Sequence, residues 1–274
     1  MISTLRERAG RNIVLGLMAI VTLYPIIGII STALEPLHDA TAGVSFWHSL
    51  SWSSMAYAWS VGHFDRYLVN TFIVCAAVVV SSVVVSVFCA YGLAVLRPAG
   101  CRWVLYLAIL AFLLPTESLI VPWYYQLRGE GLVNTYWAMI LPQMAQSVGF
   151  GVFWVRTAVL GVPKSLIEAG RLDGASEWSL LYRVIVPSIY PAIKTMAALV
   201  FLWTWNSFLL PLVMLSTPSL YVVTIGLETF QGAHFSNYAA LAAASVIAAL
   251  PVLIVYLFAQ RSFISGMFAG AVVE

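Results

Sequence analysis

The sequence predicts an all-α integral membrane protein, and three observations support that class. Of its 274 residues, 62% are hydrophobic and only 9% are charged, and its mean hydropathy is +0.94. Soluble domains are nearer to about 45–50% apolar and about 25% charged. Uncharged runs long enough to cross a bilayer recur along the chain, and their aliphatic stretches lack the alternation of a membrane β-strand. A folded chain this apolar needs lipid as part of its solvent.

Six runs approach the length of about 20 residues that spans the hydrocarbon core as a helix. They are Asn12–Leu34, Tyr67–Leu96, Trp103–Leu127, Leu132–Val155, a segment within Thr195–Ser216 and a segment within Asn237–Gln260. The first run is too long for the apolar part of a signal peptide, so we expect a retained signal-anchor helix. The short connections predict one membrane domain over residues 1–274.

The positions of Lys and Arg predict the orientation. With the N-terminus in the cytoplasm, all of the 13 Lys and Arg residues except Arg66 and Arg128 lie on the cytoplasmic side. Both termini are then cytoplasmic, and so is the polar stretch between the fourth and fifth spans.

That polar stretch, residues 161–191, has the pattern of a helix–turn–helix hairpin. Ser165 and Glu168 have the S-x-x-E spacing of a capping box, which predicts the start of a short helix. Gly174 stands where a helix C-terminus favours a residue with positive φ. A second helix is expected to begin near Ser176, with apolar positions at helical spacing.

The apolar positions of the second helix are Trp178, Leu181, Tyr182 and Ile185, and Pro187 and Pro191 follow them. A hairpin with one apolar face and charged edges suits insertion into a groove on another protein. The same features also fit a hairpin that only lies on the lipid surface, and the residue pattern does not separate the two.

The hairpin sequence resembles the coupling loop of bacterial ABC importer permeases, whose motif is E-A-A-x-x-D-G-A, a spacer and a proline. The matching residues are Glu168, Ala169, Asp173, Gly174, Ala175 and Pro187, and Gly170 stands where the motif has alanine.

The resemblance to maltose-type carbohydrate importer permeases extends over nearly the whole chain. It includes Tyr24-Pro25, Asn70-Thr71, Ala90–Ala94, Leu132–Thr135 and Trp205-Asn206-x-Phe208. The tail from Gly266 to Val272 is also similar, but it continues Val273-Glu274 where the family usually has Lys-Gly.

The resemblance implies a non-catalytic permease subunit in a bacterial cell membrane. It implies a second permease subunit, in the family's heterodimeric pattern, two cytoplasmic ATPase subunits and an extracytoplasmic solute-binding protein. ATP and Mg²⁺ would be bound by the ATPases, and this chain accordingly has no G-x-x-x-x-G-K-[ST] phosphate loop. Beyond lipid, no cofactor, metal or nucleic-acid partner of its own is expected.

The resemblance also implies residue roles in the hairpin. Glu168 would pair with a basic group on the ATPase, and Asp173 and Gly174 would form the turn. Trp178, Leu181 and Tyr182 would pack against the ATPase cleft or neighbouring helices.

Two polar residues within the spans are candidates for the translocation pathway. Glu117 lies between Pro115 and Pro122, and an acid within a span indicates function by default. It could line the pathway and bind sugar hydroxyls, or pair with a polar group of the partner subunit. Asn206 directly follows Trp205 and lies three residues after Trp203, and this group suits either a carbohydrate or helix packing.

Two other classes remain open. A stand-alone secondary transporter would need ion sites and usually internal repeats, whereas Glu117 is its only ionisable candidate and no repeat is visible. A membrane-embedded enzyme would need a catalytic constellation, and neither H-E-x-x-H nor G-x-S-x-G occurs.

Overall fold

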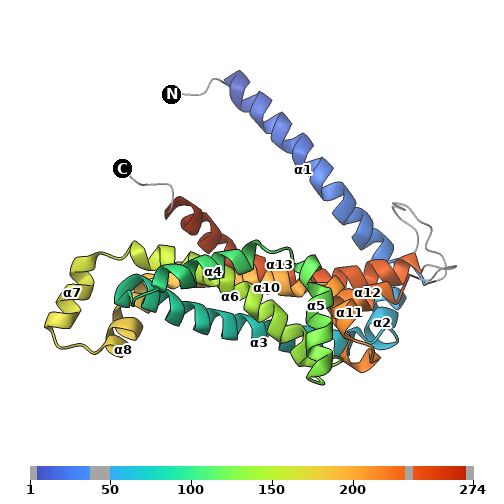
Figure 1. Cartoon of the computed structure of the whole chain (residues 1–274). Helices are drawn as coiled ribbons and strands as arrows, with labels where there is room; N and C mark the ends of the chain where they lie inside the picture. Colours follow the sequence, from blue (N-terminus) through green and yellow to red (C-terminus); the bar gives the residue numbers. More distant parts are fainter. Residues whose placement is uncertain (1–4, 38–49, 232–236, 270–274) are drawn as a thin grey trace. The chain divides into compact units, whose positions relative to one another are not determined.

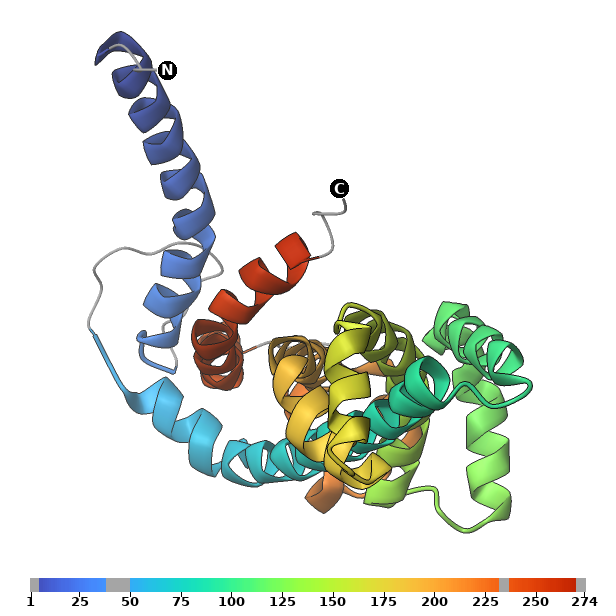
Figure 2. The same ribbon diagram turned by 90° about the vertical axis from the view of Figure 1, so that its left-hand side faces the viewer.

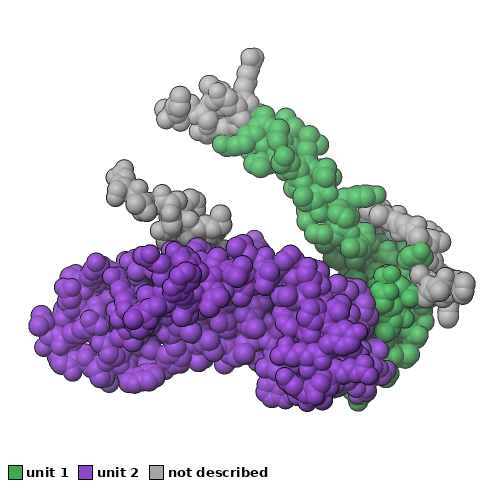
Figure 3. Space-filling model, in the orientation of Figure 1, with its two compact units in different colours: residues 1–66, 226–250 green, residues 67–225, 251–274 purple. Residues whose placement is uncertain are grey.

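The computed structural model describes residues 5–37, 50–231 and 237–269. The secondary structure elements of these residues are helices joined by short connections (Figure 1). The chain forms two compact units (Figure 3). Unit 1 comprises residues 1–66 and 226–250, and unit 2 comprises residues 67–225 and 251–274. Residues 270–274, which include the altered tail, lie outside the described residues.

Four helices are long and apolar enough to span a membrane. They lie at Gly10–Ala33, Phe64–Leu96, Tyr136–Leu160 and Tyr238–Gln260. They match the first, second, fourth and sixth predicted runs, although the fourth begins and ends about one turn later than predicted. Within the described residues the number rises to six if each of two bent helix pairs is one span. The chain is thus a multi-pass membrane protein.

The third predicted span is not one straight helix. It forms α4 (Cys101–Leu113) and α5 (Thr116–Gly129), which meet at an angle of 100° (Figure 2). The break lies at Leu114-Pro115, both of which are extended, because proline disfavours helical geometry in the residue before it. Pro122, by contrast, lies inside α5.

The fifth predicted span also differs from the expectation. Helix α10 (Tyr190–Trp205) begins before Thr195, and the chain then breaks before α11 (Leu209–Met214). Ahead of α10, the segment Glu177–Ser188 is bent by 75° relative to it. Pro191 sits in the first turn of α10, where its missing N–H has no helical partner to lose.

Unit 1 contains α1 (Leu5–Ala33), α2 (Ser53–Ser60) and the first part of α13 (Tyr238–Ala269). Phe230 packs against the rings of Tyr57 and Phe64, with centroid distances of 6.4 and 5.9 Å.

The core of unit 2 lies among α3 (Phe64–Tyr91), α6 (Tyr136–Leu160) and α10. Small residues allow these helices to approach closely. A Cβ atom added to Gly149 of α6 would lie 2.7 Å from the Ala108 carbonyl oxygen of α4. One added to Gly151 would lie 2.1 Å from Met196 Cε and 2.2 Å from Ser86 Oγ. Close packing at small residues is the usual way in which helices associate in membranes.

Two asparagines hold the segment that follows α11. Asn70 Nδ2 donates to the carbonyl oxygens of Ser219 and Tyr221, both at 2.9 Å. Asn134 Oδ1 accepts the backbone N–H groups of Ser216 and Thr217 at 2.9 and 3.0 Å. The side chains thereby satisfy backbone groups that no helix pairs, which gives a structural role to two residues of the sequence resemblance.

The close approach at Gly149 predicts a stability effect. Gly149→Ala should destabilise the protein by about 1–3 kcal/mol, because the obstructing atom is a backbone oxygen that can move only with α4. Thermal unfolding of the detergent-purified protein measures this. Gly16→Ala is the matched control, since nothing lies within 4 Å of its added Cβ atom. Equal melting temperatures for the two variants would contradict the packing argument.

Candidate functional site

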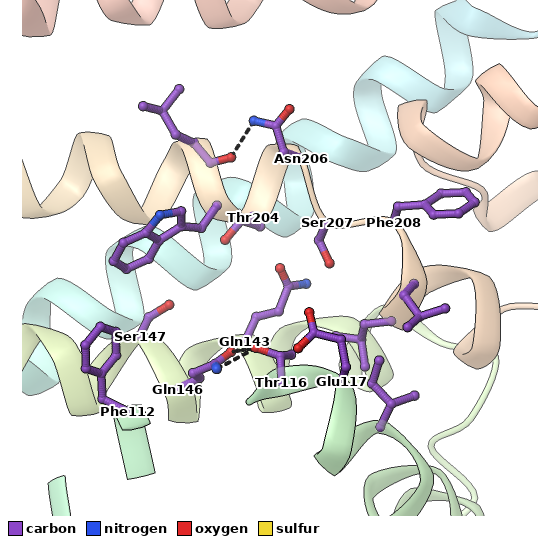
Figure 4. A pocket seen from close by; sticks show the side chains of 15 residues that line it. Phe112, Thr116, Glu117, Gln143, Gln146, Ser147, Thr204, Asn206, Ser207 and Phe208 are labelled. Atoms are coloured by element: carbon purple, nitrogen blue, oxygen red, sulfur yellow. Dashed lines mark hydrogen bonds between the residues drawn. The ribbon is translucent and has the colours of Figure 1, made fainter. Parts of the chain in front are cut away.

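Unit 2 contains a cavity of about 650 Å³ where its broken helices meet (Figure 4). Its wall is formed by the end of α4, the start of α5, the first half of α6 and the α10–α11 break. Ten labelled side chains of the wall are Phe112, Thr116, Glu117, Gln143, Gln146, Ser147, Thr204, Asn206, Ser207 and Phe208.

The α10–α11 break is stabilised by side-chain and tertiary hydrogen bonds. Asn206 Nδ2 donates to the Leu202 carbonyl oxygen at 2.8 Å, which holds the side chain against the last turn of α10. The Ser207 carbonyl oxygen accepts the Thr224 hydroxyl at 2.7 Å. Irregular backbone is tolerated at membrane depth where it is buried in protein or lines a cavity, and this break does line one.

Polar side chains from three helices face the cavity. The Glu117 carboxylate points into it (Figure 4). Gln143 Nε2 donates to the Met139 carbonyl oxygen of its own helix at 3.0 Å. Thr116 Oγ1 donates to Gln146 Oε1 at 2.8 Å, which joins α5 to α6. Membrane-embedded polar groups gathered around open space suit a ligand with hydroxyl groups.

Aromatic rings form the remaining wall. Trp203 packs edge-on against Phe150 at a centroid distance of 4.9 Å and stacks with Phe112 at 6.3 Å, and it stays 46% exposed. Trp205 instead is 3% exposed and packs against Phe72 and Phe201, at 5.0 and 5.3 Å.

The structure therefore brings together three of the four predicted pathway residues, Glu117, Trp203 and Asn206. Trp205 does not line the cavity, because adjacent residues of a helix point about 100° apart and its ring joins the core. Gln143 and Gln146 were missed by the sequence reasoning. Their signal was two amides one helical turn apart within an otherwise apolar run.

The second candidate site is the hairpin, which lies at the end of unit 2 opposite to α5 and α11 (Figure 1). Its first helix is α7 (Lys164–Leu172), which starts directly after Pro163. The predicted capping box is wrong, because Ser165 lies inside the first turn and makes no capping hydrogen bond within the described residues. Leu166 N instead donates to the Pro163 carbonyl oxygen at 3.1 Å.

The turn of the hairpin confirms the expectation for Gly174, whose φ is +78°. Ala175 N donates to the Gly170 carbonyl oxygen, and Gly174 N donates to that of Arg171. These are the two hydrogen bonds of a Schellman motif. Ser176 Oγ then accepts the Ser179 N–H at 3.3 Å and caps α8 (Glu177–Leu180), so the second helix begins where the sequence predicts.

Close packing between the two hairpin helices explains why position 170 is a glycine. A Cβ atom there would lie 2.6 Å from Leu180 Cδ2, and the Leu180 side chain is fully buried. The two helices of the hairpin thus close on one another at the position where the resembling motif has alanine.

The second helix continues as a π-helical turn (Leu181–Ile185) and α9 (Val186–Ser188), which contains Pro187. Leu181 and Ile185 are buried in the core of unit 2. Trp178 and Tyr182 are exposed, stack on one another at 6.1 Å and both meet the edge of Phe88 in α3.

A polar link joins the hairpin to the end of α3. The Tyr91 hydroxyl donates to Glu177 Oε2, and Arg171 pairs with Glu177 Oε1 at 3.0 Å. Glu177 therefore ties both hairpin helices to a residue 86 positions earlier in the chain.

The outer face of α7 remains exposed. Glu168, Ala169 and Asp173 are exposed, and Leu172 is 89% exposed. The Leu172 side chain is thus not covered by the core of unit 2.

Comparisons with known proteins identify relatives of this chain. The family model described as "binding-protein-dependent transport system inner membrane component" matches residues 82–268. An arabinooligosaccharides transport system permease protein of Halalkalibacterium halodurans is 30% identical over 93% of this chain and 92% of its own length. A diacetylchitobiose uptake system permease protein of Streptomyces coelicolor is 28% identical over 97% of both chains.

Two solved structures share the fold. A chain of a bacterial ABC transporter that imports the acidic polysaccharide alginate has a TM-score of 0.82 and 21% identity, over 95% of this chain and 99% of its own. A chain of the alginate transporter in complex with its alginate pentasaccharide-bound periplasmic protein has a TM-score of 0.67 and 17% identity, over 94% of this chain and 96% of its own.

The polar link at Glu177 predicts local stabilisation of the hairpin. Tyr91→Phe removes only the hydroxyl, so exchange of the backbone amides of residues 164–180 should rise by about tenfold, as expected for a lost hydrogen bond to a carboxylate. Hydrogen–deuterium exchange with mass spectrometry measures this. Tyr106→Phe, which removes an exposed hydroxyl from α4, is the control. Unchanged hairpin exchange in Tyr91→Phe would show that the link contributes nothing.

Proposed function

Because this chain belongs to the inner membrane components of binding-protein-dependent transport systems, we propose that it is one permease subunit of an ATP-driven carbohydrate importer. The named substrates of several relatives are carbohydrates, and the cavity of unit 2 combines amide, hydroxyl and ring surfaces that suit one. It would form half of the translocation pathway in a bacterial plasma membrane.

In this proposal, residues 1–274 form one permease domain with both termini in the cytoplasm. Each bent helix pair counts as one span, which gives six. The hairpin then lies on the cytoplasmic side, as the distribution of Lys and Arg indicates.

The observation that carries the proposal is the geometry of the hairpin. Its inner side is fixed to unit 2 by Leu181, Ile185 and the Tyr91–Glu177 hydrogen bond, while the outer side of α7 exposes Glu168 and Leu172. A short helix presented in this way suits docking in a cleft of an ATPase subunit. Lipid-surface binding alone would favour an apolar face lined by basic residues, whereas the exposed charges of α7 are mixed, with Glu168 between Lys164 and Arg171.

The continuous helices on either side of the hairpin would transmit its movement. Helix α6 reaches the hairpin from the cavity, and α10 returns from the hairpin to the cavity. Trp154 of α6 donates its indole N–H to the Ala192 carbonyl oxygen of α10 at 3.0 Å. ATP binding would favour one of two arrangements of this unit through its differential affinity for them.

Glu117, Asn206 and Trp203 are proposed to line the pathway, together with Gln143 and Gln146. The partners would be a second permease subunit, two ATPase subunits that bind ATP and Mg²⁺, an extracytoplasmic solute-binding protein and lipid. The chain itself would hold no cofactor or catalytic group.

The proposal is tested by gentle purification of the tagged chain and identification of the proteins that accompany it, followed by uptake assays in proteoliposomes. An ATPase and a second permease should co-purify, and uptake should require ATP. If the chain purifies alone and transport follows an ion gradient instead of ATP, it is a secondary transporter and the proposal fails.

Gly174 provides a prediction for coupling. Gly174→Val should leave the amount of membrane-inserted protein unchanged but reduce ATPase co-purification by roughly tenfold. A β-branched residue at φ +78° costs about 1–3 kcal/mol and distorts the turn. Gly174→Asn is the matched control, since asparagine tolerates this conformation. Normal ATP-driven uptake by the valine variant would remove the coupling role of the hairpin.

A further inference from the structure

The cavity of unit 2 has an uneven distribution of charge. Among the described residues that line it, Glu117 is the only charged one, and no Lys, Arg or His is present. In and near a bilayer, a fixed charge acts over several ångströms because little water screens it. An anionic group in the cavity would therefore meet a charge of its own sign, and no described residue of this chain that lines the cavity supplies a cation to balance it.

The hydrogen-bonding groups of the wall include three amides. The Nε2 atom of Gln143 and the Nδ2 atom of Asn206 each donate to a carbonyl oxygen of their own helix. Each of these amides keeps its carbonyl oxygen and a second N–H group. In Figure 4, the Glu117 carboxylate and the Gln143 amide point toward the space beside Ser207, whereas the Asn206 oxygen points away from it.

The third amide is paired within the wall. The Thr116 hydroxyl donates to Gln146 Oε1, and Thr116 Oγ1 lies within hydrogen-bonding distance of Gln146 Nε2 as well. The wall thus offers a ligand amide and hydroxyl groups that can both donate and accept, the Glu117 carboxylate and the half-exposed ring of Trp203.

We propose that this cavity selects its substrate by charge, admitting neutral and cationic saccharide units and rejecting anionic ones. Sugar hydroxyls, amide N–H groups and ammonium groups can all donate hydrogen bonds to the Glu117 carboxylate. A carboxylate, phosphate or sulfonate would instead lose hydration beside that carboxylate and gain no cation from the described residues of the lining. Charge-assisted bonds to Glu117 favour a protonated amine further. This inference rests on the proposed pathway role of the cavity.

The test compares three sugars of similar size and different charge. The purified complex of the full chain with its co-purifying subunits, in nanodiscs and without the binding protein, is titrated with glucose, glucosamine and glucuronate. Saturation-transfer NMR detects such weak binding, at a mildly acidic pH where the amine is protonated. Glucose and glucosamine should bind and compete with one another, with glucosamine preferred, and glucuronate should bind on the order of tenfold more weakly than glucose.

Two variants assign the selectivity to the cavity. Glu117→Gln, which keeps the shape and removes the charge, should abolish the preference for glucosamine and raise glucuronate binding by on the order of tenfold. Glu130→Gln, an exposed site beyond the end of α5 and outside the cavity, should change neither.

The outcomes separate the two proposals. Equal binding of glucuronate and glucose by the unaltered complex, or selectivity that survives Glu117→Gln, overturns the charge filter but leaves the importer function standing. Absence of binding by all three sugars, together with unaltered ATP-driven uptake in a Gln143→Leu variant, removes the cavity from the pathway and overturns both the filter and the pathway role.

Discussion

Backbone hydrogen bonding in the membrane is the constraint on which the rest of this structure depends. Within a bilayer, each N–H and C=O group must find a partner inside the protein, so a break in a spanning helix is costly. Helices of unit 2 are nevertheless interrupted at Leu114-Pro115 and after Trp205. Both breaks lie beside the same cavity, and after Trp205 the Asn206 amide and the Thr224 hydroxyl satisfy carbonyl oxygens of the interrupted backbone. The helix interruptions and the cavity therefore occur at the same place in the structure.

The sequence was sufficient to predict features that depend on local chemistry. Span positions follow from uncharged length, the turn at Gly174 follows from helix termination, and the start of the second hairpin helix follows from Ser176. Each is decided by a few neighbouring residues. The capping box at Ser165 failed for a local reason as well, because Pro163 begins the helix before the serine can cap it.

Features that depend on distant segments could not be predicted in this way. Tyr91 and Glu177 meet only because α3 and the hairpin lie side by side, and nothing in either local sequence indicates the other. Gln143 and Glu117 come from different helices and share a cavity because α4 and α5 bend by 100°. Trp205 is next to Asn206 in the sequence, but its ring packs against Phe72 and does not lie beside the cavity.

The connectivity of unit 2 explains how a displacement of the hairpin could be transmitted to the cavity. Gln143 and Leu160 lie on one unbroken helix, α6, and at about 1.5 Å per residue they are about 25 Å apart. Helix α10 covers a similar distance from Tyr190 to Trp205, and the Trp154–Ala192 hydrogen bond joins the two helices near the hairpin. The closely packed Gly151 contact with Met196 joins them again further along. A displacement of the hairpin would therefore move the α6 and α10 walls together, and the close approach of Gly149 to Ala108 and the Thr116–Gln146 hydrogen bonds would pass it on to α4 and α5. The wall around Glu117 could then change shape at the two helix interruptions beside it, at Leu114-Pro115 and after Trp205.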